Sequence, residues 1–183
     1  MTRGLAGALL LARGRAEGAM AFAPTAEEAR TSFLAALLCL PVFLLLRFAF
    51  PAPGMSGVDP FRALVADLTA YVASWAGFAL ATLPLAEAMG RRALWPRFIA
   101  AWNWANVVQY VALAVLTLPA ALGLPGFIAD TLGLLGLGYA VWLQWFTTRA
   151  ALGLPGLRAA AFVVLDLAIA AFLSGLAVRV AAG

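Results

Sequence analysis

Long apolar stretches, separated by short breaks that contain proline, glycine or charged residues, make up most of this chain. A helix needs about 20 apolar residues to cross the roughly 30 Å apolar core of a bilayer. Five stretches meet that requirement, over residues 26–50, 60–89, 96–122, 126–151 and 156–182. The pattern therefore predicts an all-α integral membrane protein, in which residues 25–183 form one domain of five transmembrane helices.

Two of these helices begin at recognisable capping sequences. Thr25 followed by Glu28 is a capping box, in which the hydroxyl accepts from one free backbone N–H and the carboxylate reaches back to another. Asp59 is the expected N-cap of the second helix, with Pro60 at its first position. Pro41 lies inside the first helix, where we expect a kink.

Glycine marks the expected ends of several helices. Gly90 is the expected C-cap of the second helix, and residues 51–59 before that helix are a turn-rich loop. The hexapeptide Ala-Leu-Gly-Leu-Pro-Gly occurs at 121–126 and again at 151–156. We interpret it as a stop signal on both sides of the fourth helix, because glycine ends a helix and proline blocks its continuation.

Residues 1–24 are expected to form a separate segment, an amphipathic helix that lies on the membrane surface. Their apolar runs are shorter than the core of a signal peptide. One face of the helical wheel is apolar and consists of Leu5, Ala8, Leu9, Ala12, Ala16, Ala19 and Met20. Arg3, Arg13 and Glu17 lie off this face, and four glycines weaken the helix. A frayed terminus is the alternative interpretation.

The composition supports a membrane protein and excludes much chemistry. Hydrophobic residues make up 65% of the 183 residues and charged residues 11%, against about a quarter charged in soluble domains. All 12 basic residues are arginine, and the sequence has no histidine. Schiff-base lysine chemistry, histidine-ligated metals and Ser-His triads are therefore excluded. The single cysteine, Cys39, cannot form an internal disulfide.

The arginines also predict the orientation, because cytoplasmic loops carry an excess of positive charge. Nine arginines fall on one side of the predicted spans: Arg3, Arg13, Arg15, Arg30, Arg91, Arg92, Arg97, Arg149 and Arg158. Three fall on the other side: Arg47, Arg62 and Arg179. This asymmetry predicts a cytoplasmic N-terminus and a C-terminus on the opposite side. No basic stripe with interleaved aromatic residues is present, so a nucleic-acid partner is not expected.

Four amide side chains and one carboxyl side chain form a layer inside the spans, in the half nearer the arginine-rich side. Because polar groups are costly in the apolar core of a membrane, each is a candidate for function. At about 1.5 Å per helical residue, Asn106 and Asp166 lie roughly 12–13 Å from that side. The candidate intramembrane polar site consists of Asn103, Asn106, Gln109, Gln144 and Asp166.

Asp166 is the charged member of this site. It shares its helix face with small residues, which mark close helix packing: Ala159, Ala170, Ser174 and Ala177. We expect Asp166 to accept a hydrogen bond from Asn103 or Asn106 across the interface between the third and fifth helices. Two interpretations stay open: a polar clamp that fixes the helix register, and a binding or proton-relay site open to the cytoplasm.

Other charged residues are expected at helix ends. Asp67, Asp130 and Glu87 are interpreted as carboxylates in contact with interfacial water, with a pairing of Asp67 to Arg62 or Arg47 left open. Arg47 is expected to extend to the membrane interface. Glycines at 133, 136 and 138 give the fourth helix a small-residue patch for close packing.

The arrangement resembles the bacterial branch of the Yip family of membrane proteins. The likeness lies in the stretch from Leu5 through Arg30 into Ser32–Leu46. Two further runs, Ala-Trp-Asn-Trp at 101–104 with Gln109 and Gln-Trp-Phe-Thr-Thr-Arg at 144–149, look like an uncharacterised group of small alphaproteobacterial membrane proteins. The resemblance implies a fold of five spans after an amphipathic segment and a bacterial inner membrane, and it supplies no catalytic residues.

Taken together, these features favour a non-enzymatic inner-membrane protein that acts by interaction, as a scaffold or membrane organiser of Yip-like type. The alternative is a small transporter or permease subunit that uses the polar layer. An unrecognised enzyme or a subunit of a larger complex also remains open. No catalytic residue, cofactor or metal site is expected. The expected partners are the lipid bilayer and a second copy of the chain or another membrane protein.

Overall fold

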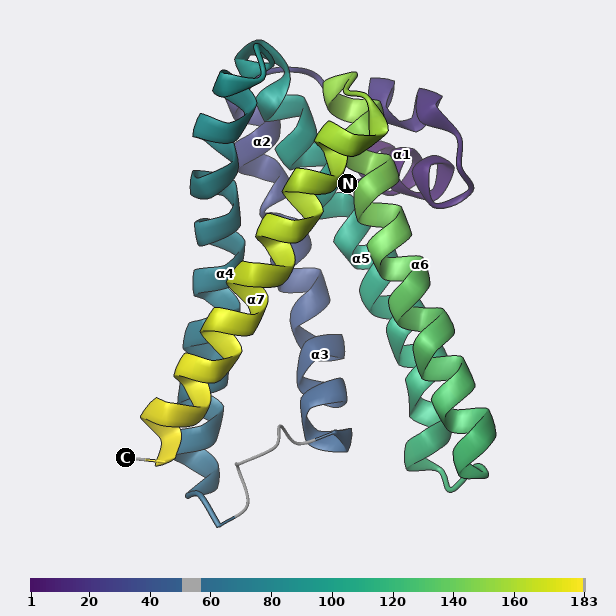
Figure 1. Cartoon of the computed structure of the whole chain (residues 1–183), viewed down its shortest axis with the longest axis vertical. Coiled ribbons are helices and arrows are strands. Elements are labelled where there is room, and N and C mark those ends of the chain that lie inside the picture. The colour runs from purple at the N-terminus through teal and green to yellow at the C-terminus, as the bar shows by residue number, and fades with distance from the viewer. Residues whose placement is uncertain (51–56, 183) are drawn as a thin grey trace.

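The computed structural model describes residues 1–50 and 57–182, and every regular element in these ranges is a helix (Figure 1). Five helical spans are long and apolar enough to cross a membrane. The elements are α1 (Thr2–Ala12), η1 (Ala16–Ala21), α2 (Ala26–Ser32), α3 (Leu34–Ala49), α4 (Pro60–Ala88), η2 (Arg92–Leu94), α5 (Trp95–Ala121), α6 (Gly126–Leu152) and α7 (Gly156–Ala182). The expected all-helical membrane fold is therefore confirmed.

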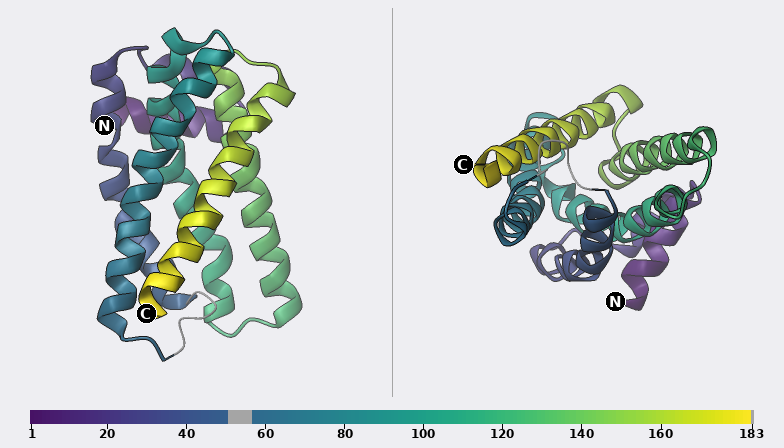
Figure 2. Two further views of the ribbon diagram at one scale, coloured as in Figure 1. Left: turned by 60° about the vertical axis from the view of Figure 1, so that its left-hand side comes forward. Right: turned by 90° about the horizontal axis from the view of Figure 1, so that it is seen from below.

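The long helices form two pairs that separate toward one end of the bundle. Helix α4 packs along α7, and α5 packs along α6, while α3 lies between the pairs and contacts α5 (Figures 1 and 2). We call the end with α1 and the α4–α5 and α6–α7 connections the closed end. The end with the α5–α6 connection and the C-terminus is the open end, where the two pairs lie furthest apart (Figure 1).

Aromatic side chains fill the half of the bundle near the closed end. The Trp102 ring stacks on Phe78 with centroids 4.2 Å apart, and the edge of Trp75 meets Trp102 at 5.4 Å. Phe98 lies between Phe78 and Phe162, at 6.0 and 5.3 Å. Large rings bury much apolar area and pack in tilted and stacked pairs. These contacts hold α4, α5 and α7 together at the closed end.

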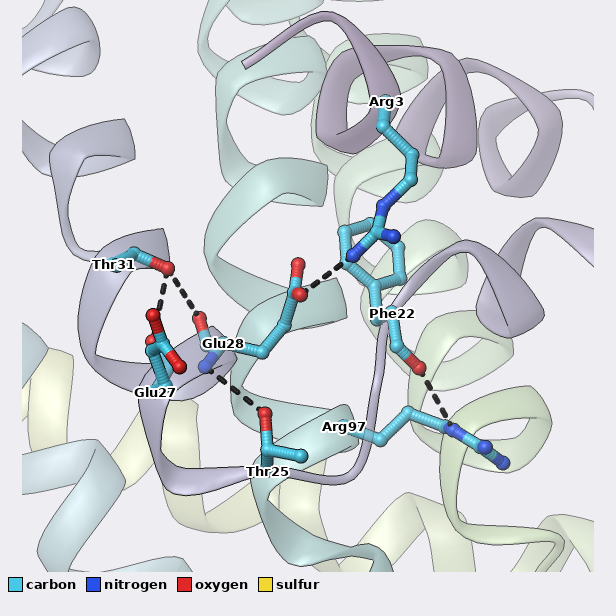
Figure 3. Close-up of polar contacts among 7 residues, drawn as sticks. All are labelled: Arg3, Phe22, Thr25, Glu27, Glu28, Thr31 and Arg97. Atoms are coloured by element: carbon cyan, nitrogen blue, oxygen red, sulfur yellow. Dashed lines mark hydrogen bonds and ion pairs between the residues drawn. The ribbon is translucent and has the colours of Figure 1, made fainter.

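The capping sequences are confirmed with one exception. Asp59 accepts from the Arg62 backbone N–H at 2.9 Å, and Pro60 begins α4. Thr25 accepts from the Glu28 N–H at 3.2 Å. The carboxylate of Glu28, however, does not reach back to Thr25, because it pairs with Arg3 of α1 at 2.6 Å (Figure 3). The expected capping box is thus half right, and its acidic residue joins two elements instead.

The glycine stops are confirmed. Gly123 and Gly153 adopt φ values of +86° and +61°, one in each copy of the repeated hexapeptide, and Gly90 adopts +69° after α4. Residues with a side chain rarely adopt this left-handed conformation. The part of the predicted loop at 51–56 lies outside the described residues.

The first span is interrupted at Phe33, eight residues before the expected kink at Pro41, and Pro41 itself lies within α3. The Ser32 hydroxyl donates to the Ala29 carbonyl at 2.6 Å. That carbonyl is the normal α-helical acceptor for the Phe33 N–H, which instead bonds to Arg30 at 3.3 Å. A side chain that competes for a backbone acceptor in this way ends the regular helix.

The N-terminal segment is not the one continuous helix that we expected, and small residues line most of the face of α1 that packs on the bundle. Helix α1 ends before Gly14, whose φ is +74°, and the chain turns back as the 3-10 helix η1. The buried residues of α1 are Gly4, Gly7, Ala8 and Leu11. Of the predicted apolar face, Leu5, Leu9 and Met20 are exposed on the protein surface, whereas Ala8 and Ala19 are buried. The expected contact of this face with a membrane surface stays a prediction.

The glycines explain which face of α1 packs on the bundle, because they are contact points of the segment. A Cβ atom on Gly4 would lie 2.5 Å from the Trp104 indole, and one on Gly18 would lie 2.5 Å from the Gly7 carbonyl oxygen. Side chains at these positions would push α1 away from α5 and η1 away from α1. Close approach, rather than helix propensity, therefore decides which face of α1 is buried.

Polar contacts fix the segment to the closed end of the bundle. Arg97 of α5 donates from Nε to the Phe22 carbonyl at 3.1 Å, beside the Arg3–Glu28 pair (Figure 3). Tyr139 of α6 donates its hydroxyl to the Ala12 carbonyl at 3.0 Å. The segment thus lies across the bundle, at a steep angle to the long helices (Figure 2).

Candidate functional site

The polar layer near the closed end is present, but Asp166 has a different partner from the expected one. Gln144 of α6 donates from Nε2 to Asp166 Oδ2 at 2.6 Å. Neither Asn103 nor Asn106 donates to Asp166, so the predicted bond between the third and fifth spans is wrong. Helix α7, which carries Asp166, packs on α4 and α6. The partner of Asp166 therefore comes from α6 and not from α5.

The two asparagines of α5 are bound elsewhere. Asn103, which is fully buried, donates from Nδ2 to the Ser32 hydroxyl at 2.8 Å. Asn106 donates to the carbonyl of Trp102 in its own helix at 3.0 Å. The layer therefore consists of two separate bonded pairs, Asn103–Ser32 and Gln144–Asp166, with Asn106 bound locally.

The layer also holds polar atoms that lack partners among the described residues. The amide oxygens Asn103 Oδ1 and Gln109 Oε1 are buried without a donor, and the hydroxyl oxygen Thr147 Oγ1 is buried without any hydrogen-bond partner. A buried polar group without a hydrogen bond costs free energy. Of the five predicted site residues, the structure joins only Gln144 and Asp166 to each other.

A second charged site, which the sequence reasoning placed in interfacial water, lies in the open half. Arg47 of α3 donates from Nε to Asp67 Oδ2 of α4 at 2.5 Å, and the side chains are 15% and 13% exposed. Arg47 therefore turns toward the neighbouring helix, and Asp67 is a largely buried carboxylate and not a solvated one. Of the two partners left open for Asp67, the structure selects Arg47 over Arg62.

This ion pair borders a cleft between α3, α5 and α6. The cleft has a volume of about 810 Å³ and an apolar wall that includes Phe43, Leu113 and Leu134. Arg47 and Asp130 supply charged groups to the same cleft. This volume lies within the range of about 300–1,000 Å³ that is typical of ligand sites.

A smaller cavity of about 240 Å³ lies on the other side of the ion pair. It is lined by α3, α4, α5 and α7, and includes Asp67, Ser74 and Ser174. Arg47 and Tyr110 line both spaces. The ion pair in the open half of the bundle therefore lies between the cleft and this cavity.

One sequence signal could have identified this site. Arg47 and Asp67 lie in consecutive spans that run in opposite directions, and each is set back from its helix end by apolar residues. Opposite charges at similar depth in neighbouring antiparallel helices favour pairing, because an isolated charge in the membrane is costly. The sequence interpretation left a pairing of Asp67 with Arg62 or Arg47 open, and it did not predict that the pair is buried.

The remaining sequence interpretations have mixed outcomes. Asp130 and Glu87 are exposed, as expected, and Glu87 pairs with Arg92 at 2.6 Å. Of the three glycines proposed for close packing, only Gly136 approaches another helix, where a Cβ would lie 3.4 Å from Leu116. A Cβ at 133 or 138 would meet no atom within 4 Å, so close packing at these two positions is wrong.

Comparisons of the chain with models of known protein families, with curated proteins and with solved structures found no match. The resemblance to the Yip family thus stays a prediction.

Proposed function

We propose that this membrane protein acts without catalysis, by binding other membrane components in the cleft of its open half, as a scaffold or membrane organiser of Yip-like type. The contrast between the two halves of the bundle is the observation that supports this proposal. Near the closed end, aromatic rings fill the space between α4, α5 and α7, and the N-terminal segment packs against α5 and α6. Near the open end, a cleft of about 810 Å³ lies between α3, α5 and α6.

The proposed location is the bacterial inner membrane, with the closed end in the cytoplasm. Nine of the 12 arginines belong to α1, α2, η2 and the segments beside the α4–α5 and α6–α7 connections, or to the turn after α1. All of these elements lie at the closed end. The excess of positive charge there supports this orientation.

Cysteine labelling tests the proposal without a known phenotype. In a Cys39→Ala background, we would introduce Ala129→Cys at the cleft, Thr147→Cys in the buried layer and Ala93→Cys as an exposed control at the closed end. A membrane-impermeant maleimide is then applied to whole cells and to inverted membrane vesicles.

We expect the cysteine at 129 to react in whole cells and the one at 93 to react in inverted vesicles. The cysteine at 147 should react only after denaturation, because Thr147 is fully buried. Reaction of the folded 147 variant in inverted vesicles would contradict the proposal, since it requires an aqueous path into the polar layer. Exchange of the 93 and 129 patterns would reverse the proposed orientation.

A second candidate function is a small transporter or permease subunit that uses the polar layer. The unpartnered, buried oxygens of Asn103 and Gln109 favour it, because they could accept hydrogen bonds from a polar solute. The same labelling experiment separates the two functions. A transporter requires the cysteine at 147 to react from at least one side of the membrane.

A further inference from the structure

We propose that the cleft of the open half binds a phospholipid with a phosphoethanolamine-like headgroup, whose phosphate meets Arg47 and whose ammonium meets Asp130. This inference rests on the proposed function, since it names the membrane component that the cleft takes. It depends on three features of the cleft: the depth of its charges, the free donors of Arg47 and the presence of both charge signs.

The charges lie near the open-end termini of α3 and α6. Arg47 is two residues from the end of α3 at Ala49, and Asp130 is four residues from the start of α6 at Gly126. At about 1.5 Å per residue, these positions are roughly 3 and 6 Å from the helix ends. The apolar wall, which includes Leu113 and Leu137, lies further toward the middle of the bundle. A molecule with a charged head and an apolar tail matches this order.

Arg47 has hydrogen-bond donors left for a ligand. Its Nε is used by Asp67, whereas no acceptor among the described residues contacts its terminal nitrogens. Arginine binds phosphate through paired N–H groups, and Asp67 holds the guanidinium in place at the edge of the cleft. The ion pair thus positions a phosphate-binding group instead of only neutralising a charge.

The second charge distinguishes the headgroup. Asp67 neutralises Arg47, so Asp130 leaves the cleft with an excess negative charge. Asp130 is exposed and makes no ion pair among the described residues. A purely anionic headgroup would be repelled by this carboxylate, whereas an ammonium group would be attracted to it. A zwitterionic head with a primary ammonium therefore fits both charges.

Native mass spectrometry of the purified full-length chain in a non-ionic detergent tests this assignment. Phosphatidylethanolamine and phosphatidylglycerol are titrated separately, because both carry a phosphate and only the first carries an ammonium. We expect phosphatidylethanolamine to bind at least about tenfold more tightly to the natural sequence, since one charge-assisted contact is lost with the other lipid.

Variants separate the two contacts. Asp130→Asn should weaken phosphatidylethanolamine binding about tenfold and leave phosphatidylglycerol binding unchanged or stronger. The double variant Arg47→Gln/Asp67→Asn should weaken both lipids, and it avoids leaving a single buried charge without a partner. Arg179→Gln and Asp59→Asn are matched controls at the open end, and neither residue lines this cleft. Asparagine at 59 retains the helix cap.

Equal affinity for the two lipids, or an equal effect of cleft and control variants, would overturn the inference. A third result would also overturn the inference: no lipid binds, and the chain forms a dimer that is lost when Gly133→Trp fills the cleft. The occupant of the cleft would then be a second copy of the chain. None of these results would make Thr147→Cys reactive in the folded protein. Failure of the lipid assignment is therefore distinguishable from failure of the proposed function.

Discussion

Arg47 and Asp67 form an ion pair between α3 and α4 within the membrane-spanning bundle, and both side chains are about 85% buried. The pair joins two helices that follow one another in the chain. Removing one member of such a pair leaves an uncompensated charge in an apolar surrounding, which is more costly than removing both. Energetically, the two residues therefore act as a unit.

The first prediction follows from this coupling. Asp67→Ala should destabilise the protein by about 3–5 kcal/mol, because it leaves the Arg47 guanidinium without its partner. The double variant Arg47→Met/Asp67→Leu should lose much less stability than either single variant. Thermal unfolding of the purified chain in detergent measures both effects. Additive losses in the double variant would show that the two residues are not coupled.

The second prediction concerns the N-terminal segment. Gly4→Leu should release α1 from α5, because even a Cβ at this position would lie 2.5 Å from the Trp104 indole. The five long helices should stay folded, so the effect is confined to the first 22 residues. Hydrogen–deuterium exchange should show faster exchange over residues 1–22.

Gly77→Ala is the matched control for this experiment. A Cβ at 77 would meet no atom within 4 Å, and Gly77 lies inside α4. Alanine in a helix interior is about 0.5–1 kcal/mol more favourable than glycine. The control should therefore keep or raise the melting temperature. Unchanged exchange of residues 1–22 in Gly4→Leu would contradict the packing of α1 on Trp104.

The fold was largely predictable because its signals are local. The spans from Pro60 onward agree with the sequence prediction to within one residue at each end, since length, apolar content and the Gly and Pro stops are properties of short segments. Asp59 and the two hexapeptides needed no knowledge of neighbouring helices. The arginines could also be assigned to the two ends of the bundle, because this assignment requires only the order of the spans along the chain.

The contacts of the polar residues were not predictable in this way, because they depend on how each helix is rotated against its neighbours. Nearly every face of the spans is apolar, so hydropathy gives little information on rotation. Asp166 consequently bonds to Gln144 instead of an asparagine, and Arg47 bonds to Asp67. In α1, the apolar pattern did not identify the face that packs on the bundle, because close contact with the Trp104 indole buries the small residue Gly4.

The third prediction tests whether Asp166 is structural. Asp166→Asn should keep the stability of the protein, because the asparagine oxygen can still accept from Gln144 Nε2. Asp166→Leu should cost about 1–3 kcal/mol, since it leaves the buried amide of Gln144 without an acceptor. Melting temperatures of the two variants measure the difference. A large loss in Asp166→Asn would show that the charge of Asp166, and not its hydrogen bond, stabilises the bundle.

The fourth prediction concerns Ser32, whose hydroxyl contacts two elements at once. It donates to the Ala29 carbonyl and accepts from Asn103 of α5. Ser32→Ala should therefore have two consequences. The Phe33 N–H regains its regular acceptor at Ala29, and the buried amide of Asn103 loses its partner at a cost of about 1–3 kcal/mol.

Both consequences can be measured in one variant. The loss of stability appears as a lower melting temperature, and the continuous helix appears as slower amide exchange at Phe33. Ser74→Ala is a suitable control, because the Ser74 hydroxyl donates only to the Tyr71 carbonyl in its own helix, so little stability should be lost. If Ser32→Ala lowers stability without slowing exchange at Phe33, then the serine holds α5 but does not cause the break between α2 and α3.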